Sequence, residues 1–255
     1  MGDGLIKTND GSYTLYSDQF NQHYHSVKEG AINEALQKHI IPALSYHKGK
    51  KELNILDICF GLGYNTLATL YYIKKNNLNI KLNIYSPEFD TELLKSLQNF
   101  NYPIEFNNFT EIINSLSNHY YYKDNKIKIE IFNGDAREYI KKLDNIDIVF
   151  QDPFSSDVNH LLWTKEYFED IKKSMSEDAI ITTYSIATPI RLSIWENDLN
   201  IYEYKPEKSN RITIASNRYI DQNNYKYIDM KLKKTRNKEA KALYDKDNRC
   251  LKMNQ

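Results

Sequence analysis

Four acidic side chains stand where one ligand could reach all of them. They fall at or near the ends of four predicted strands and are Asp57, Glu88, Asp135 and Asp152. A doubly wound sheet binds ligands beyond the carboxyl ends of its strands, at the point where the strand order reverses. We therefore expect these carboxylates along one edge of a sheet, where they can accept hydrogen bonds from hydroxyl and amino groups.

A glycine loop directly follows the first of these strands. It reads Phe60-Gly61-Leu62-Gly63, and the missing side chains let the backbone approach a ligand closely. Asn65 is expected to open the next helix, whose dipole favours a negatively charged group such as a carboxylate. A dinucleotide site would favour a third glycine, and Thr66 stands there instead.

The acidic residues after the second and third strands suggest which ligand this is. Glu88 lies about two dozen residues past Gly63, where a carboxylate can accept both ribose hydroxyls. Asp135 can accept from an adenine amino group, but it can also cap the helix that begins at Ala136. Together these features predict S-adenosylmethionine as the cofactor. The predicted cofactor residues are Asp57, Phe60, Gly61, Gly63, Asn65, Glu88, Asp135 and Ala136.

The tripeptide Asp152-Pro153-Phe154 points to the chemistry. Its carboxylate is expected over the transferable methyl group, its proline leaves carbonyls free to accept from an amine, and its phenylalanine can stack on a planar base. Asp152 is therefore the predicted catalytic residue, as general base, although it could instead bind the ammonium group of the cofactor. The alternative interpretation is a turn with a buried phenylalanine.

Aromatic residues can supply the substrate contacts. Aromatic rings can stack on a planar group of the substrate, although most of the 21 tyrosines must serve packing. His25 can act as a second base or a substrate contact, or simply be structural. The predicted substrate contacts are Tyr24, His25, Ser26, Pro153, Phe154, Trp163 and Tyr184.

The elements that must position these residues form a regular alternation. The predicted strands are residues 53–58, 80–85, 127–132, 146–150, 179–184, 201–204 and 211–215. The predicted helices are residues 65–74, 91–100, 111–117, 136–142, 165–173 and 189–197. Such alternation predicts an α/β fold with a mostly parallel, Rossmann-like sheet of the class I S-adenosylmethionine-dependent methyltransferase type.

Two flanking segments complete the predicted organisation. Residues 1–50 are expected to form a hairpin and helix extension, with a strand at 13–16 and a helix that starts from the capping box Ser26 and Glu29 and ends at Pro42. Residues 51–217 are the predicted catalytic domain. Residues 218–255 are the predicted basic tail, which is either a binding surface or solvated and disordered.

The composition excludes several classes of protein. The formal net charge is zero, so no global field marks a nucleic-acid binder. Two cysteines form neither a disulfide framework nor a metal-ligand cluster. No leader peptide is evident, and no apolar run approaches the roughly 18 residues of a spanning helix. We expect a cytoplasmic protein with no bound metal and no membrane association.

Several blocks resemble the methyltransferase domain of the MnmC family, most of all its stand-alone form without the FAD-dependent oxidase half. The resemblance runs from about Thr8 to Ser216. Its blocks are Asp10 to Thr14, Tyr24 to Ser26, Phe60 to Asn65, Asp152 to Ser155, Leu162 to Thr164 and Arg211 to Ser216. Cys59, Leu62 and Tyr64 depart from the family's Gly, Thr and Leu, and only Lys208 to Arg211 remain of its basic stretch.

The resemblance implies methyl transfer from S-adenosylmethionine to the primary amine of 5-aminomethyluridine, thiolated or not, at the tRNA wobble position. It places Gly61, Gly63 and Asn65 at the methionine part, Glu88 at the ribose, Asp135 at the adenine and Asp152 at the reacting centre. With tRNA as the substrate, the aromatic contacts can stack on a splayed anticodon base and the basic tail can contact tRNA phosphates.

Other classes of protein remain open from the residues. A methyltransferase or aminopropyltransferase for a small-molecule amine would share the cofactor loop but need no basic surface, so tRNA retention at varied salt would discriminate. A DNA methyltransferase is disfavoured because no target-recognition domain is evident. A non-enzymatic nucleotide-binding module is disfavoured because all four acidic positions are kept.

Overall fold

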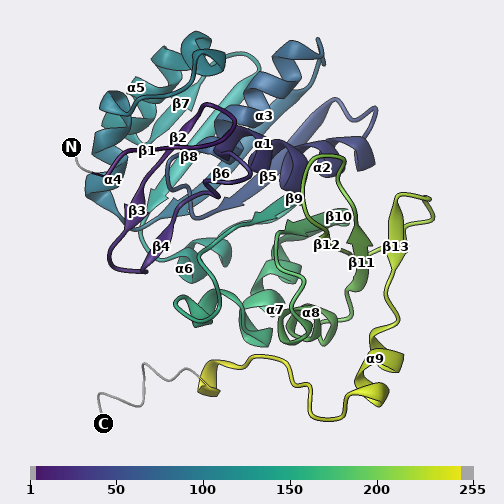
Figure 1. The fold of residues 1–255 in the computed structure, drawn as a ribbon. Helices are drawn as coiled ribbons and strands as arrows, with labels where there is room; N and C mark the ends of the chain where they lie inside the picture. The colour runs from purple at the N-terminus through teal and green to yellow at the C-terminus, as the bar shows by residue number, and fades with distance from the viewer. Residues whose placement is uncertain (1–3, 248–255) are drawn as a thin grey trace.

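A single large sheet organises the chain. The computed structural model describes residues 4–247. Nine strands lie in the order β13-β11-β12-β10-β9-β5-β6-β8-β7, drawn in Figure 1. The five central strands are parallel. They are β5 (Glu52–Ile58), β6 (Lys81–Glu88), β8 (Ile127–Asn133), β9 (Ile146–Gln151) and β10 (Met175–Thr183). The strand order reverses between β5 and β9, which is where the predicted site residues converge.

Antiparallel strands extend this sheet on both sides. They are β7 (Tyr121–Lys123), β11 (Asn200–Tyr204), β12 (Ile212–Ser216) and β13 (Tyr225–Tyr227). The predicted Rossmann-like α/β fold is confirmed, and each predicted strand from residue 53 onward is present with ends that differ by a few residues. The sequence pattern missed β7 and β13, because strands of three residues are too short to show a period of two.

Helices cover both faces of the sheet, and each face has its own hydrophobic core. One face carries α3 (Tyr64–Lys75), α4 (Thr91–Ser96), α5 (Thr110–His119) and the short helices η2 (Leu97–Asn99) and η3 (Ile104–Phe109). The other carries α6 (Ala136–Ile140), η4 (His160–Leu162), α7 (Lys165–Ser174), α8 (Thr188–Trp195) and α9 (Met230–Arg236). Because it is covered twice, the central strand β9 is buried along its whole length.

The N-terminal helix differs from its prediction. Gly30 caps it with a φ of 87°, and it runs through α1 (Ala31–Ala35), a π-helical segment η1 (Leu36–Ile40) and α2 (Ile41–Tyr46). The predicted end at Pro42 is wrong, because a proline is tolerated in the first turn of a new helical segment, and α2 begins directly after the wider π turn. The predicted start at Ser26 is also wrong, because the helix begins at Ala31. The Ser26 hydroxyl still accepts from the Glu29 N–H at 3.1 Å, which is half of the predicted capping box.

Two small hairpins precede this helix and pack on the catalytic domain. They consist of β1 (Ile6–Lys7), β2 (Tyr13–Thr14), β3 (Tyr16–Ser17) and β4 (Gln22–His23). The Tyr64 hydroxyl donates to the Tyr13 carbonyl at 2.7 Å. The Gln22 amide donates to the Ser155 hydroxyl at 2.6 Å and accepts from the Ser155 N–H at 3.2 Å. The β3–β4 hairpin is thereby held against the loop that follows β9.

Residues 218–247 belong to the fold, so the prediction of a separate or solvated tail is wrong for them. β13 pairs with β11, α9 packs beside α8, and the short helix η5 (Asp245–Asp247) returns to the catalytic domain. Asp245 accepts two hydrogen bonds from Arg137, at 2.8 and 2.9 Å, and one from Thr164 at 2.7 Å. The remaining tail, residues 248–255, lies outside the described residues.

The helices within residues 4–247 include none with the length and apolar character that a membrane crossing requires.

Candidate functional site

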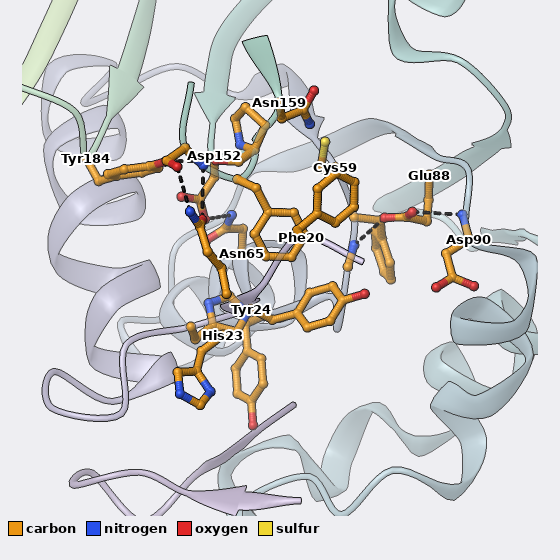
Figure 2. Close-up of a pocket in the computed structure, with 18 of the residues that line it drawn as sticks. Phe20, His23, Tyr24, Cys59, Asn65, Glu88, Asp90, Asp152, Asn159 and Tyr184 are labelled. Atoms are coloured by element: carbon orange, nitrogen blue, oxygen red, sulfur yellow. Dashed lines mark hydrogen bonds between the residues drawn. The ribbon is translucent and has the colours of Figure 1, made fainter. Parts of the chain in front are cut away.

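A cavity of about 230 Å³ lies at the carboxyl ends of β5, β6 and β9. Figure 2 shows residues that face it from the N-terminal segment, the glycine loop and the loops after β6, β9 and β10. Predicted residues among its lining are Tyr24, His25, Ser26, Phe60, Gly61, Asn65, Glu88, Asp152, Pro153, Phe154 and Tyr184. The structure therefore brings most of the predicted cofactor and substrate residues into one space.

The glycine loop has the backbone conformation that its residues predict. Gly61 has a φ of 54° and Gly63, which caps α3, a φ of 74°. A Cβ atom on Gly63 would lie 2.8 Å from the Phe60 ring, so a side chain cannot be added there without displacing that ring. Cys59 also has a positive φ, 64°, which explains why the resemblance leads one to expect glycine at this position.

Glu88 joins the end of β6 to the glycine loop. Its carboxylate accepts from the N–H groups of Gly61 at 2.8 Å and of Phe89 and Asp90 at 2.9 Å each. The side chain is buried yet lines the cavity, and burial raises the pKa of this carboxyl. Glu88 thus shapes the loop and presents its carboxylate to the cavity, as a ribose contact requires.

Asp57 lies beneath the cavity rather than in its lining. It is 1% exposed and accepts from the Thr66 hydroxyl at 2.8 Å and from the Asn65 amide at 3.3 Å. Burial, with the neighbouring charge of Asp152, raises its pKa to about 7. Its contacts show that Asp57 supports the start of α3, so the structure offers no direct cofactor contact for it.

Asp152 follows β9 and has two polar neighbours. Its Oδ2 accepts from the Asn65 amide at 3.0 Å, and its Oδ1 lies 3.4 Å from Nε2 of His39. Among the described residues, the buried Oδ1 atom of Asn65 has no hydrogen-bond partner. Asn65 and Asp152 both line the cavity, and the Asp152 carboxylate is suited to a positively charged amine.

Hydrogen bonds from Tyr184 and Trp163 hold the loop after Asp152 in place. The Tyr184 hydroxyl donates to the Pro153 carbonyl at 3.0 Å and uses one of its two lone pairs, so only the other remains for an incoming amine. Trp163 is fully buried, outside the cavity lining, and its indole N–H donates to the Phe154 carbonyl at 2.8 Å. The prediction that Trp163 stacks on a substrate base is therefore wrong in this structure, because its ring fixes the loop instead.

The face of Phe154 meets aromatic neighbours. Its ring stacks on Phe20, with centroids 4.6 Å apart and planes at 26°, and meets Tyr24 edge-on at 5.1 Å. Phe20 comes from the turn between β3 and β4 and was missed from the sequence, because nothing local distinguishes it from other phenylalanines. Phe20 and Tyr24 line the same cavity as Asp152 and Asn65, and Figure 2 labels all four.

His25 and Ser26 lie at the side of the cavity where the N-terminal helix begins. His25 Nδ1 is 3.7 Å from a carboxylate oxygen of Glu34, and the Ser26 N–H donates to the same oxygen at 2.8 Å. Burial opposes the ionisation of Glu34, but hydrogen bonds and charge from His25 and Lys38 outweigh it and lower the pKa of the carboxyl. His25 is thus tied into a charged network at the cavity edge.

Asp135 and Ala136 are not in the cavity lining. Asp135 is exposed and caps α6 by accepting from the N–H groups of Arg137 at 2.7 Å and Glu138 at 3.3 Å. The helix-cap interpretation is confirmed, and the adenine contact stays a prediction.

His39 is a cavity neighbour that the sequence analysis missed. It lies in the π-helical segment, is completely buried, and places Nδ1 2.7 Å from the Thr182 hydroxyl. Pro42 was a signal in the sequence, because a proline within a helical pattern marks an irregular turn, and the turn before Pro42 contains His39. Such π turns recur at functional sites.

Comparison with known proteins agrees with this geometry. Residues 105–217 match a family described as S-adenosyl-L-methionine-dependent methyltransferase. The structure is similar to MnmC2 of Aquifex aeolicus, with a TM-score of 0.75, 28% identity, and coverage of 86% of this chain and 72% of that one. The chain carries an MnmC-like methyltransferase domain. Its cofactor is S-adenosylmethionine.

Two further proteins are similar to this chain. The uncharacterized protein MJ0670 of Methanocaldococcus jannaschii is 31% identical over 198 residues, which are 74% of this chain and 52% of that protein. The chain thus spans about half the length of this curated relative. A probable spermidine synthase from Corynebacterium glutamicum shares the fold, with a TM-score of 0.54 and 14% identity over 92% of this chain and 85% of that one.

The cavity of the MnmC-like domain fits its cofactor. The Glu88 carboxylate lines the cavity and is an acceptor for hydroxyls, and the Asn65 side chain lines it at the start of α3, beside the glycine loop. At Gly61, a Cβ atom would come within 3.3 Å of the Tyr24 ring, so the loop and the N-terminal segment already meet closely. When bound, S-adenosylmethionine supplies a methyl group on a positively charged sulfur.

Proposed function

We propose that this chain methylates the primary amine of 5-aminomethyluridine, with or without the 2-thio group, at the wobble position of tRNA. The observation that carries the proposal is that Asp152 and the Phe154 ring line one cavity beside the glycine loop. An acidic group next to an aromatic face suits an amine attached to a planar base. The similarity to MnmC2 supports the same substrate class.

The cofactor contacts proposed for individual residues follow from their positions. Asn65, Gly61 and Gly63 would hold the methionine part, since the first two line the cavity and the third shapes the loop. Glu88 would accept the ribose hydroxyls. Asp135 and Ala136 would contact adenine only if the ligand extends past the cavity toward α6.

Asp152 is the proposed general base. An alkylamine is mostly protonated at neutral pH, and methyl transfer requires its free electron pair. Asp152 can accept the proton and hold the nitrogen in line with the methyl group, so that positioning supplies most of the acceleration. The Tyr184 hydroxyl fixes the adjacent Pro153 carbonyl. Burial and the Asp152 charge raise the pKa of Tyr184, which keeps the hydroxyl a donor.

Phe154, Tyr24 and Tyr184 are the proposed stacking surface for the wobble base. Because the Phe20 ring lies on the face of Phe154, a base can stack there only after the β3–β4 hairpin shifts. Short hairpins with exposed turns can move at small cost, since they bury little surface.

Mass spectrometry of nucleosides tests the proposal. Undermodified tRNA that carries 5-aminomethyluridine is incubated with the protein and cofactor labelled in its methyl group. We expect one labelled methyl on the aminomethyl nitrogen of the wobble nucleoside. The same assay includes putrescine and other small diamines. They are tested with S-adenosylmethionine and with its decarboxylated form, because the small-molecule alternative is either a methyltransferase or an aminopropyltransferase. If these amines are modified while the undermodified tRNA receives no methyl group, the result contradicts the proposal and supports the small-molecule alternative.

A further inference from the structure

His39 occupies a position from which it can act on the reaction without touching the substrate. It is completely buried in η1, and the ring lies edge-on to Phe150 with centroids 5.6 Å apart. Its two nitrogens point at different partners, Nδ1 toward the Thr182 hydroxyl at 2.7 Å and Nε2 toward Oδ1 of Asp152 at 3.4 Å. The ring thus links a strand of the core to the proposed base.

The hydrogen-bond inventory of this group decides where the ring proton lies. A threonine hydroxyl has one proton, and Oγ1 of Thr182 is 2.7 Å from Nδ1 of His39 but 3.5 Å from the Val149 carbonyl. The shorter contact favours donation to Nδ1. A neutral ring that accepts at Nδ1 carries its proton on Nε2, which faces the Asp152 carboxylate.

The contact between Nε2 and Asp152 is incomplete in this structure. Among the described residues, His39 Nε2 has no partner that meets hydrogen-bond geometry, although it is buried. A buried donor without a partner is costly, and a small movement of the Asp152 carboxylate would satisfy it. Catalytic hydrogen bonds are often long in a free enzyme and tighten in the reactive complex.

We infer that His39 is a positioning residue whose Nε2 proton holds the Asp152 carboxylate charged and oriented as the acceptor of the substrate's proton. The inference rests on the proposed function. In the step, an N–H bond of the substrate ammonium breaks, the nitrogen keeps the electron pair, and an O–H bond forms on Asp152. His39 stabilises the carboxylate before the step, and the proton passes to solvent after product release.

Other charged and titratable groups face this pair, and the test must allow for them. From β5 comes Asp57, from the glycine loop Cys59, from the end of β10 Tyr184, and from the N-terminal helix the paired Glu34 and Lys38. None of them changes in the variants below.

Single-turnover methylation of tRNA measures the chemical step. His39→Met should lower the rate at pH 7 about 10- to 100-fold, a part of the roughly 100- to 10,000-fold that a positioned base contributes, with the cofactor Kd within about threefold of wild type. His39→Gln, whose amide can donate from a similar place, should recover most of the rate.

The pH dependence separates this role from a purely structural one. As the pH rises from 7 to 9.5, more substrate arrives as free amine, so the defect of His39→Met should shrink to about threefold. A defect of constant size across this range would overturn the inference. His47 is the matched control, because it is a buried histidine at the end of α2 whose Nε2 lies 3.1 Å from the Asp147 carbonyl, away from the cavity. His47→Met and His47→Gln should leave the pH profile unchanged.

Nitrogen-15 NMR of histidine-labelled protein, recorded without cofactor, provides a readout apart from activity. We expect a proton on Nε2 of His39, the nitrogen that faces the Asp152 carboxylate. A ring with Nε2 unprotonated in the wild type would overturn the inference. If Nε2 is protonated but no tRNA amine is methylated, the proposed function fails while the assigned pairing stands.

Discussion

Asp152 receives its environment from distant parts of the chain. Asn65 follows the glycine loop, and His39 comes from the N-terminal helix. Asp152→Asn keeps the shape of the side chain but removes its capacity to take a proton. We expect methyl transfer to fall at least about 100-fold while the cofactor Kd changes by less than about fivefold. Calorimetry measures binding and single-turnover assays measure transfer; a large loss of binding would instead make Asp152 a cofactor ligand.

Glu88 offers a second test at the scale of the residue. Glu88→Gln should weaken cofactor binding about tenfold or more, because one carboxylate oxygen becomes an amide that can no longer accept hydroxyl or loop N–H groups. Calorimetry with S-adenosylhomocysteine gives the Kd. An unchanged Kd would remove Glu88 from the ribose site.

Asp57 predicts a pH dependence of stability. Its pKa is raised in the folded state to about 7, so its favourable contribution is present below the unfolded value near 4 and is lost as the pH rises through about 7. The free energy of unfolding of the wild type should therefore fall relative to Asp57→Asn by roughly 2 to 4 kcal/mol between pH 4 and pH 8. Urea denaturation across this range measures both proteins, and parallel curves would contradict the prediction.

At the scale of elements, the β3–β4 hairpin controls access to Phe154. Phe20→Ala removes the ring that lies on Phe154. If a base replaces Phe20 there, the cost of displacing an aromatic pair, about 0.5 to 1.5 kcal/mol, is no longer required, so the KM for tRNA should fall about two- to tenfold. Steady-state kinetics with varied tRNA provides the measurement. A higher KM would show that Phe20 itself contributes to binding.

The elements were largely predictable from the sequence, whereas several side-chain roles were not. Strands such as 53–58 and helices such as 165–173 have strong local periodicity, so tertiary contacts only adjusted their ends. The continuation of the N-terminal helix past Pro42 depends on a π turn, and a proline alone does not tell a wider turn from the end of a helix. Trp163 was misjudged and His39 was overlooked because burial and partners are set by segments far away in the chain.

At the scale of the whole molecule, residues 218–247 complicate a deletion test of tRNA binding. Tyr225 and Met230 are buried in the two cores, so removing residues from 222 onward would destabilise the fold. Exposed charges are a cleaner target. If this basic region contacts tRNA, Lys231→Glu with Lys238→Glu should raise the KM for tRNA several-fold and flatten its salt dependence, with the Tm unchanged. Identical salt dependence would exclude a role for these two lysines.

Long-range hydrogen bonds set an order in which parts of the fold can form during synthesis. The hydrogen bond of Gln22 requires Ser155, which is synthesised 133 residues later. The hydrogen bonds of Arg137 and Thr164 require Asp245, which comes 108 and 81 residues later. The ribosome must therefore release most of the chain before the β3–β4 hairpin can bond to the loop after β9. It must release still more before the segment from β13 to η5 can pack on the catalytic domain. Until then the nascent chain carries the glycine loop without its cover, so a complete methyl-transfer site arises only late in translation.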